Sequence, residues 1–295
     1  MRGEGDMDGL ISKSQRAQVL VQALPYIQRY WNRVVVIKYG GHAMESEELK
    51  AQVMEDIVLL QLVGVKVVLV HGGGPEINDT LDAMGVKTEF VNGLRVTDAE
   101  TAQVVQMVLA GKVGKSLVNL IETTGGKAMG ICGIDGRMVE AKSKSSALGY
   151  VGDITHVNVE PIKDLLEKGY IPVVSSLGCD AEGNVYNINA DTMAAHISGA
   201  MGAECLISMT DIAGIMEDPA DPASLIPVAD INDAVELFRR GIIKGGMIPK
   251  VESCIEALLC GVKKVFILDG RIPHSILLEM LTDEGSGTMM VGEKK

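Results

Sequence analysis

Short apolar runs rich in β-branched residues alternate along the chain with longer segments of mixed polarity. The first two runs, 34–41 and 66–75, both carry glycines near their carboxyl ends. Further apolar runs lie at 128–134, 170–177, 204–209 and 262–268. Runs of this length and composition are typical of buried strands, and the segments between them carry helical patterns, as 47–62 does. Strands that alternate with helices predict an α/β fold with a mostly parallel sheet covered by helices on both faces.

The glycine turns after the first two strands predict an anion site. Lys38 stands beside Gly40 and Gly41 at the end of the first strand, and 71–74 places a histidine before three glycines. Glycines let backbone N–H groups approach a ligand closely and favour anions there. A strand-end lysine on its own is more often a solvated side chain, but the two turns together favour a multiply charged ligand such as a nucleoside triphosphate. We expect His71 to brace its turn rather than transfer protons.

The segment before the first strand has the pattern of a helix from about residue 12 to 31, capped by Ser12 or Ser14 and kinked at Pro25. This helix is not needed to complete a βα unit. It either covers the core of this chain or serves as an arm for oligomerisation or regulation, and the pattern alone leaves both open. Residues 1–11 are expected to be a disordered lead-in.

Composition narrows the class of ligand. The chain has 295 residues, 47% hydrophobic and 3% aromatic, with a net charge of −12. Such an acidic chain with few aromatic rings is a poor binder of nucleic acid, so an anionic substrate requires a few well-placed cations. The cysteines form no C-x-x-C pair, and neither a signal peptide nor a run long enough to span a bilayer is apparent, so we expect a reduced, cytoplasmic protein without a membrane partner.

Several polar positions are candidates for the site. Arg95 precedes a helix that we expect to start with a capping box at 97–100 and to end near Gly111. Asn187 and Asp191 lie in a polar cluster before an apolar stretch, and Lys250 follows a glycine pair at the start of a helix, where a bound phosphate would explain a cation. The segment 111–116 resembles a P-loop, but its glycine spacing is wrong and it follows a helix.

Taken together, these motifs resemble the amino acid kinase family, and within it the branch whose phosphoryl acceptor is N-acetyl-L-glutamate. The matching stretches are 37–41, 71–75, 93–98, 187–191, 210–214 and 245–250, and they cover the chain from about residue 34 to its end. The resemblance implies a three-layer αβα sandwich with two lobes. It also implies ATP-dependent phosphorylation of the acceptor's side-chain carboxylate, the second step of arginine biosynthesis, with Mg²⁺ bridging the phosphates and no metal ligand from the protein.

The resemblance also assigns roles to individual residues. Lys38 and Lys250 are implied to stabilise the transferred phosphoryl group, with Asp191 holding both lysines. The implied acceptor-binding residues are Gly73, Gly74, Arg95 and Asn187, with Arg95 on the α-carboxylate, and the implied ATP-binding residues are Gly40, Gly41, Thr210, Asp211, Gly214 and Lys250. It divides the chain into an N-terminal lead-in and helix (1–33), an acceptor-binding lobe (34–178) and a lobe (179–295) that binds ATP and arginine.

Relatives with an N-terminal helix resemble the arginine-inhibited hexamers, which are trimers of dimers. The resemblance therefore implies inhibition by L-arginine at a site that includes His274, Glu279, Gly285 and Gly287. Some relatives bind the nitrogen-signalling protein PII, which makes PII a further partner to test.

Three alternatives remain. A kinase of the same fold could act on aspartate, glutamate, carbamate or UMP, although a UMP kinase should offer more cationic groups and an aspartokinase a further regulatory domain. A non-catalytic nucleotide sensor would have lost the lysines, whereas Lys38, Asp191 and Lys250 are all present. A dehydrogenase is disfavoured because no G-x-G-x-x-G follows a strand.

Overall fold

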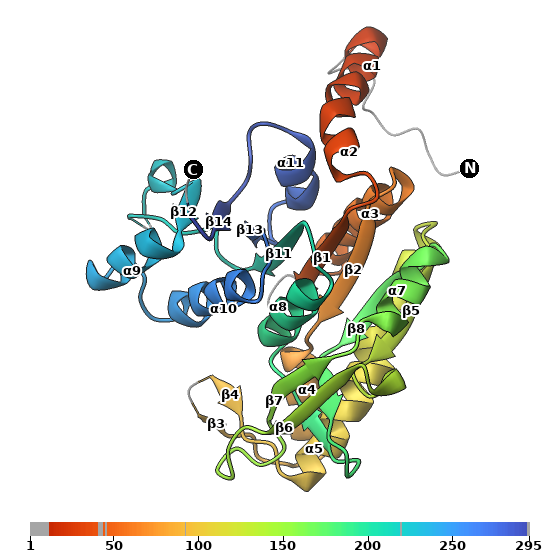
Figure 1. The fold of residues 1–295 in the computed structure, drawn as a ribbon, viewed down its shortest axis with the longest axis vertical. Helices are drawn as coiled ribbons and strands as arrows, with labels where there is room; N and C mark the ends of the chain where they lie inside the picture. The colour runs from red at the N-terminus through yellow and green to blue at the C-terminus, as the bar shows by residue number, and fades with distance from the viewer. Residues whose placement is uncertain (1–11, 41–43, 45, 92, 219, 294–295) are drawn as a thin grey trace.

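The computed structural model describes residues 12–40, 44, 46–91, 93–218 and 220–293. An eight-stranded sheet forms its centre, in the order β12-β14-β13-β11-β1-β2-β8-β5. All neighbouring strands in this sheet are parallel except the pair β13 and β14, which is antiparallel. The strands are β1 (Val34–Tyr39), β2 (Lys66–His71), β5 (Ala128–Cys132), β8 (Ile171–Ser175), β11 (Cys205–Thr210), β12 (Val228–Asp230), β13 (Lys264–Asp269) and β14 (Thr288–Val291). The four apolar runs predicted after the glycine turns are all strands of this sheet (Figure 1).

Helices cover both faces of the sheet, as the alternating pattern predicted. Side chains alternate along β1, so Val35 and Ile37 enter one core and Val36 the other. The first core is packed by α3 (Glu47–Leu62), α4 (Gly74–Ala83) and α11 (Ser275–Leu281), and the second by α7 (Glu160–Glu167), α8 (Ala190–Ala200), α9 (Ile231–Arg239) and α10 (Met247–Leu259). The result is the expected three-layer αβα sandwich.

A second, four-stranded sheet was not predicted. Its order is β10-β9-β6-β7, formed by β6 (Val139–Ser143), β7 (Gly152–Val157), β9 (Leu177–Cys179) and β10 (Val185–Asn187). A short hairpin joins β3 (Phe90–Val91) to β4 (Leu94–Arg95) beside it (Figure 1). These strands are short and carry charged residues, so the apolar pattern does not identify them. The position 178/179, taken as the limit between two lobes, lies inside β9, and the division of the chain into three parts stays a prediction.

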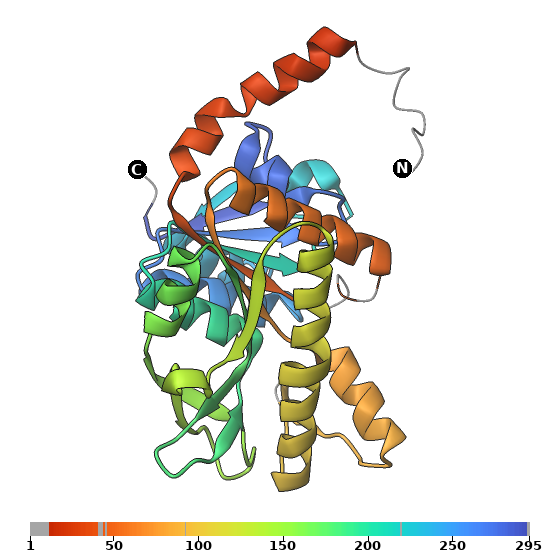
Figure 2. The same ribbon diagram turned by 90° about the vertical axis from the view of Figure 1, so that its right-hand side faces the viewer.

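The helix after Thr97 is longer than predicted. It starts at Asp98, whose side chain accepts from the Thr101 N–H, and not at Thr97. It continues through α5 (Ala99–Gln106), the π-helical segment η2 (Met107–Val113) and α6 (Gly114–Thr123), so the prediction that it ends near Gly111 was wrong (Figure 2). Nothing lies near the position of a Cβ at Gly111, and the wider π turn carries the helix past this glycine.

This continuous helix also bears on whether a segment of the chain could cross a membrane. Over 99–123 it is, by length and composition, the one described helix that could cross a membrane, contrary to the expectation from the sequence. Buried core helices pass the same test, and Val105, Leu109, Leu117 and Ile121 on its inner side pack into the first core.

The N-terminal segment forms two helices. Ser12 and Gln15 make a capping box at the start of α1 (Lys13–Gln22), and Pro25 is the second residue of α2 (Leu24–Tyr30), so the chain breaks before the proline instead of kinking around it. No residue of α1 is buried, and the Leu20 side chain is 75% exposed. Figure 2 shows α1 extending away from the body of the molecule. Helix α1 therefore does not cover the core of this chain, whereas α2 buries Tyr30; the predicted lead-in 1–11 lies outside the described residues.

Candidate active site

The carboxyl ends of four neighbouring strands meet at one edge of the central sheet. Lys38 of β1 pairs in register with Ser208 of β11, Tyr39 pairs with His71 of β2, and Thr210 pairs with Asp269 of β13. Strands β2, β8 and β5 lie on one side of β1, whereas β11, β13, β14 and β12 lie on its other side. The strand order therefore reverses between β1 and β11. Ligands of open α/β sheets bind at such a point.

Lys38 is held at this edge by Asp191. Its Nζ lies 3.0 Å from Oδ1 of Asp191, which stands in the first turn of α8. The Ser208 hydroxyl donates to the same carboxylate oxygen at 3.5 Å, from the strand next to β1. Both side chains of the ion pair are largely buried, so the ammonium group has one defined position at the end of its strand.

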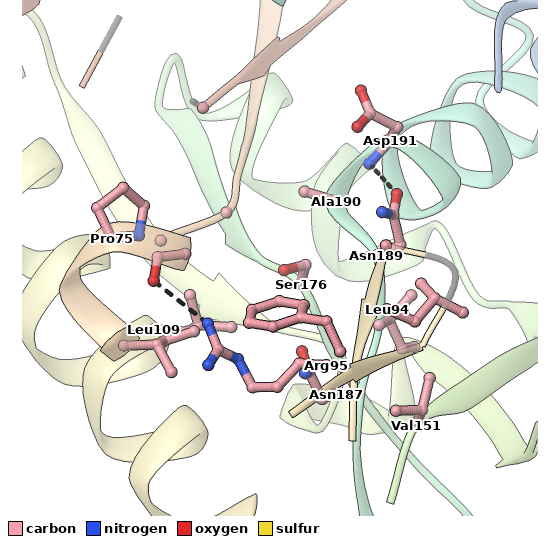
Figure 3. Close-up of a pocket in the computed structure, with 18 of the residues that line it drawn as sticks. Pro75, Leu94, Arg95, Leu109, Val151, Ser176, Asn187, Asn189, Ala190 and Asp191 are labelled. Atoms are coloured by element: carbon pink, nitrogen blue, oxygen red, sulfur yellow. Dashed lines mark hydrogen bonds between the residues drawn. The ribbon is translucent and has the colours of Figure 1, made fainter. Parts of the chain in front are cut away.

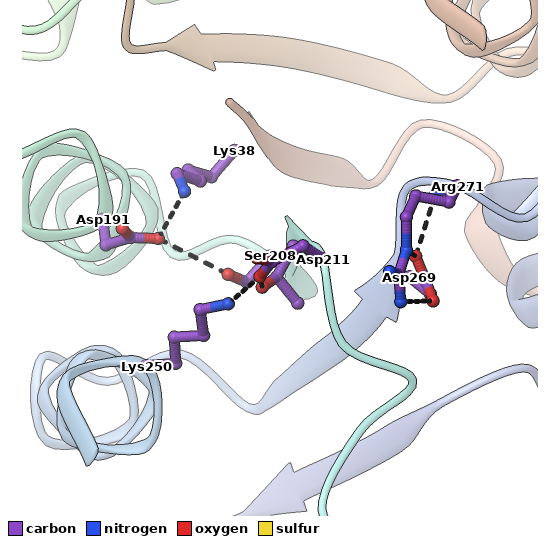
Figure 4. Close-up of polar contacts among 8 residues, drawn as sticks. Lys38, Asp191, Ser208, Asp211, Lys250, Asp269 and Arg271 are labelled. Carbon is purple, nitrogen blue, oxygen red and sulfur yellow. Dashed lines mark hydrogen bonds and ion pairs between the residues drawn. The ribbon is translucent and has the colours of Figure 1, made fainter. Parts of the chain in front are cut away.

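Lys250 is held by a different carboxylate. It lies in the first turn of α10 and donates to Oδ1 of Asp211, which also accepts from the Thr210 hydroxyl at 3.0 Å. This ion pair holds the pKa of Asp211 well below its usual range. Figure 4 shows the two lysines on opposite sides of the end of β11. The expectation that Asp191 holds both lysines was wrong for this arrangement. Lys250 pairs instead with Asp211 at the end of β11.

A cavity of about 240 Å³ opens beside Lys38 and Asp191. The glycine turns line it with Gly40, Gly72, Gly73 and Gly74, and α4 begins at the last of these, so the positive end of the helix dipole faces the cavity. The structure therefore brings both predicted turns to one ligand site. Gly41 lies outside the described residues.

Arg95 lies on the opposite wall of this cavity (Figure 3). Its side chain is only 7% exposed, with the guanidinium 4.8 Å from the centre of the Phe90 ring. Nη2 donates to the Gly74 carbonyl at 3.3 Å, whereas Nη1 is buried without a hydrogen-bond partner. Burial lowers the pKa of Arg95 from its ordinary value. An arginine that lines a cavity is suited to a carboxylate or phosphate ligand, because its planar guanidinium can donate two parallel hydrogen bonds.

Asn187 is linked to Arg95 by two hydrogen bonds through Thr97. Its Nδ2 donates to the Thr97 hydroxyl at 3.3 Å, and that hydroxyl donates to the Arg95 carbonyl at 2.9 Å. Asn189 is the N-cap of α8, and its side chain accepts from the backbone N–H groups of Asp191 and Thr192. The cluster 187–191 thus has two parts, one that lines the cavity and one that fixes the helix carrying Asp191.

The predicted nucleotide residues lie at the end of β11 and beyond. Thr210 and Asp211 belong to the Lys250 contact, whereas Gly214 packs against Thr288, whose Oγ1 would lie 2.6 Å from a Cβ there. Sequence reasoning missed Arg271, which binds Asp269 at the end of β13 in a bidentate pair (2.9 and 2.8 Å) and lies near this edge (Figure 4). Applying the strand-end argument to β13 as well would have found it.

The four residues assigned to arginine lie around α11. His274 precedes this helix and binds Asp56 of α3 at 2.6 Å, while Glu279 accepts from the Ser286 N–H at 2.8 Å, next to Gly285. Burial raises the pKa of Asp56 to about 6. Gly287 packs against Leu268. His274 also lines a cavity of about 640 Å³ formed with residues of the N-terminal helices and α11.

Within the described ranges, no group of three histidine, cysteine or acidic side chains is arranged to hold a metal ion. The carboxylates nearest the cavity edge, Asp191 and Asp211, are each engaged by a lysine. Mg²⁺ is commonly bound by one or two carboxylates together with substrate phosphates and water. The donor set here suits a magnesium ion that arrives with a nucleotide better than one held by the protein alone.

Comparison with known proteins agrees with this arrangement. The model of the amino acid kinase family matches residues 33–269. The chain belongs to the amino acid kinase family. It is 54% identical over 284 residues to the acetylglutamate kinase of Clostridium beijerinckii, a match that covers 95% of this chain and all of that protein. The expectation of this family from the motifs, including the branch, is confirmed.

Solved structures show the same fold. The smu.665 protein of Streptococcus mutans superposes with a TM-score of 0.72 at 31% identity, over 88% of this chain and 99% of that one. The N-acetylglutamate synthase of Neisseria gonorrhoeae, complexed with coenzyme A and N-acetyl-glutamate, gives a TM-score of 0.81 at 24% identity. The match covers 95% of this chain but only 64% of that synthase. At this identity the likeness concerns the fold alone.

Proposed function

We propose that this protein transfers the γ-phosphoryl group of ATP to the side-chain carboxylate of N-acetyl-L-glutamate, the second step of arginine biosynthesis. The observation that carries the proposal is the cavity that joins Arg95 to the Lys38–Asp191 pair at the sheet edge. The relatives that match almost the full chain are acetylglutamate kinases, which identifies the acceptor.

The reaction needs positioning and charge stabilisation more than proton transfer. An acceptor carboxylate oxygen attacks the γ-phosphorus while the bond to the β-phosphate oxygen breaks, giving N-acetyl-L-glutamyl 5-phosphate and ADP. The carboxylate is already ionised at neutral pH, so no general base is required. Lys38 and Lys250 approach from two sides of the β11 end and neutralise the charge that spreads over the phosphoryl oxygens.

Binding of the acceptor follows from the opposite wall of the cavity. The guanidinium of Arg95 donates to the α-carboxylate. Asn187 binds the acetylamino group, since its amide is held by Thr97 and the residue lines the cavity. The N–H groups of Gly73 and Gly74 at the start of α4 face the reacting carboxylate. Thr210, Asp211 and Gly214 border the nucleotide, and Gly40 faces its phosphates.

Mg²⁺ accompanies ATP and neutralises part of the charge on the bridging phosphate oxygens. Asp191 and Asp211 do not ligate it in this scheme, because each holds a catalytic lysine. The residues of this chain therefore bring the cations together and orient the two anionic substrates.

We further propose feedback inhibition by L-arginine and a hexamer built as a trimer of dimers. The exposed apolar side chains of α1 and the adjoining cavity beside His274 and α11 support this assignment. All five cysteines are free thiols, which supports a cytoplasmic location.

The function is tested by trapping the acyl phosphate with hydroxylamine as a hydroxamate. We expect ATP-dependent hydroxamate with N-acetyl-L-glutamate and not with L-glutamate or L-aspartate, because a free α-amine adds a positive charge that the site does not match. Suppression by L-arginine would support the regulatory assignment as well. Turnover of aspartate or glutamate alone would replace the acceptor, and no turnover of any acceptor would favour a nucleotide sensor.

Removal of α1 tests the regulatory arm. Deleting residues 1–23 takes away no buried side chain among the described residues 12–23, whereas Tyr30 of α2 belongs to the core and must stay. We expect the truncated protein to lose its hexamers in light scattering and to require about tenfold more L-arginine for half inhibition, with kcat unchanged. A truncated protein that remains hexameric and fully inhibited would contradict the assignment.

A further inference from the structure

His71 is a fully buried histidine at the end of β2, directly before the three glycines. Its Nδ1 lies 2.8 Å from the carbonyl oxygen of Gly72, and its Nε2 lies 3.0 Å from the hydroxyl of Ser175. Ser175 is the last residue of β8 and pairs with His71 in register across the two parallel strands. The hydroxyl also lies 3.1 Å from the carbonyl of Leu109 in the π-helical segment η2. One imidazole thus joins a glycine turn, a strand and a helix.

The partners determine which nitrogen carries the proton. A carbonyl oxygen only accepts hydrogen bonds, so Nδ1 of His71 donates to Gly72. Burial lowers the pKa of His71 to about 4, so the ring is neutral at pH 7 and Nε2 is an acceptor. The Ser175 hydroxyl has two acceptors within reach, the Leu109 carbonyl at 3.1 Å and the unprotonated Nε2 at 3.0 Å. The ring is therefore held as the Nδ1–H tautomer.

This hydrogen bond fixes the orientation of the peptide between Gly72 and Gly73. In a trans peptide the carbonyl and the N–H of one unit point in opposite directions, and the structure contains no cis peptide bond. Because the Gly72 carbonyl faces the imidazole, the Gly73 N–H faces away from it. Gly72 and Gly73 both line the cavity beside Lys38. Glycine alone has little preference for this orientation, so an external constraint is needed.

We propose that His71 and Ser175 are positioning residues that hold the Gly72–Gly73 peptide with its N–H directed at the reacting carboxylate and phosphoryl oxygens. This inference rests on the proposed function, and it adds a pair of residues that touch neither substrate. A preorganised donor loses effectiveness when it must be reoriented during the reaction. Their role is therefore to hold the Gly73 N–H in its required orientation before the substrates bind.

The long helix completes this arrangement at two glycines. A Cβ at Gly114 would lie 3.1 Å from the Ser175 hydroxyl and 3.2 Å from Nε2 of His71, and a Cβ at Gly73 would lie 2.9 Å from the Leu109 side chain. The helix can approach the histidine and the glycine turn only because these positions lack side chains. A π-helical segment at the point of contact is common at functional sites and places the Leu109 carbonyl beside Ser175.

Two single substitutions disturb the network without touching the cavity. Ser175→Ala removes the donor to Nε2, and Gly114→Ala pushes a methyl group between the serine and the histidine. Gly111→Ala is the matched control, because it lies in the same helix with nothing within 4 Å of its Cβ position. We expect kcat to fall about 10- to 100-fold in both variants, less than the loss of a whole donor, with KM for ATP within about twofold. Gly111→Ala should behave as the wild type.

Imidazole ¹⁵N NMR gives a readout that a merely structural role would not move. In the wild type we expect the His71 ring, assigned by its absence in a His71→Asn variant, as the neutral Nδ1–H tautomer from pH 7 to pH 5. In Ser175→Ala we expect the Nε2 signal to shift as its hydrogen bond is lost. A loss of kcat with an unchanged melting temperature and a changed Nε2 signal would support the proposal.

Two results would overturn it: an Nε2–H tautomer in the wild type, or a normal kcat in Ser175→Ala. These outcomes are distinct from a failure of the proposed function, which the wild-type hydroxamate assay decides. If the wild type failed to phosphorylate N-acetyl-L-glutamate, the tautomer measurement would still decide whether the peptide is held as described.

Discussion

Replacing Lys250 with alanine is expected to lower kcat by two to three orders of magnitude with little change in KM for either substrate. The ammonium group lies at the end of β11 beside Asp211, and in the proposed reaction it stabilises the charge on the phosphoryl oxygens during transfer. Loss of one preorganised charge of this kind typically costs about 3–4 kcal/mol of transition-state stabilisation. Steady-state kinetics with varied ATP and varied N-acetyl-L-glutamate measures both parameters.

The control for this substitution is Lys263→Ala. Lys263 is an exposed lysine paired with Glu204 at 2.7 Å, at the start of β13 and therefore at the opposite edge of the sheet. It should leave kcat within about twofold, since exposed ion pairs contribute little. A Lys250→Ala enzyme with near-normal kcat would remove Lys250 from the phosphoryl-transfer step. A large rise in KM for ATP alone would instead make it a nucleotide-binding residue.

Arg95→Lys is expected to raise KM for N-acetyl-L-glutamate about 10- to 100-fold while kcat changes far less. The guanidinium donates to the Gly74 carbonyl through Nη2 and carries further N–H donors in a fixed plane, an arrangement that a single ammonium group cannot reproduce. It also loses the contact with the Phe90 ring. Isothermal titration with N-acetyl-L-glutamate separates binding from turnover.

Arg239→Lys serves as the matched control for Arg95, because that guanidinium is exposed on α9 and contacts only Glu236 of its own helix, 4.0 Å away. We expect wild-type kinetics from it. If Arg95→Lys left KM for the acceptor unchanged, the Arg95 guanidinium would not be the carboxylate donor, and the orientation of the acceptor in the cavity would have to be reversed.

The part of the fold that follows from long apolar runs was predictable from the sequence. Six of the eight central strands coincide with such runs, because strands buried on both faces must be apolar throughout. The second sheet was missed because strands such as β6 and β7 carry polar and charged side chains along their short length. The length of the helix through Gly111 was missed because a glycine is a common end signal, and tertiary packing overrode it here.

For the site, the residues were predictable but their partners were not. Glycines and lysines at strand ends already indicated a polyanion, since the carboxyl ends of parallel strands meet at one edge. Whether Asp191 or Asp211 holds Lys250 depends on where α8 and α10 lie relative to β11, which no local pattern encodes. The link between His71, Ser175 and Leu109 joins residues up to 104 positions apart and depends on strand register and on where the long helix packs.

The pairing of each catalytic lysine with an aspartate has a consequence for selectivity among small ions. Lys38 with Asp191 and Lys250 with Asp211 sum to no net charge, so the phosphate side of the cavity does not attract anions strongly at rest. A free phosphate or sulfate ion would have to compete with an aspartate for each lysine and would reach neither Arg95 nor the adenosine side. A nucleotide bound together with its acceptor engages all of these groups at once. We expect inorganic phosphate and sulfate to bind weakly to these two lysines, because each lysine is already paired with a carboxylate within the protein.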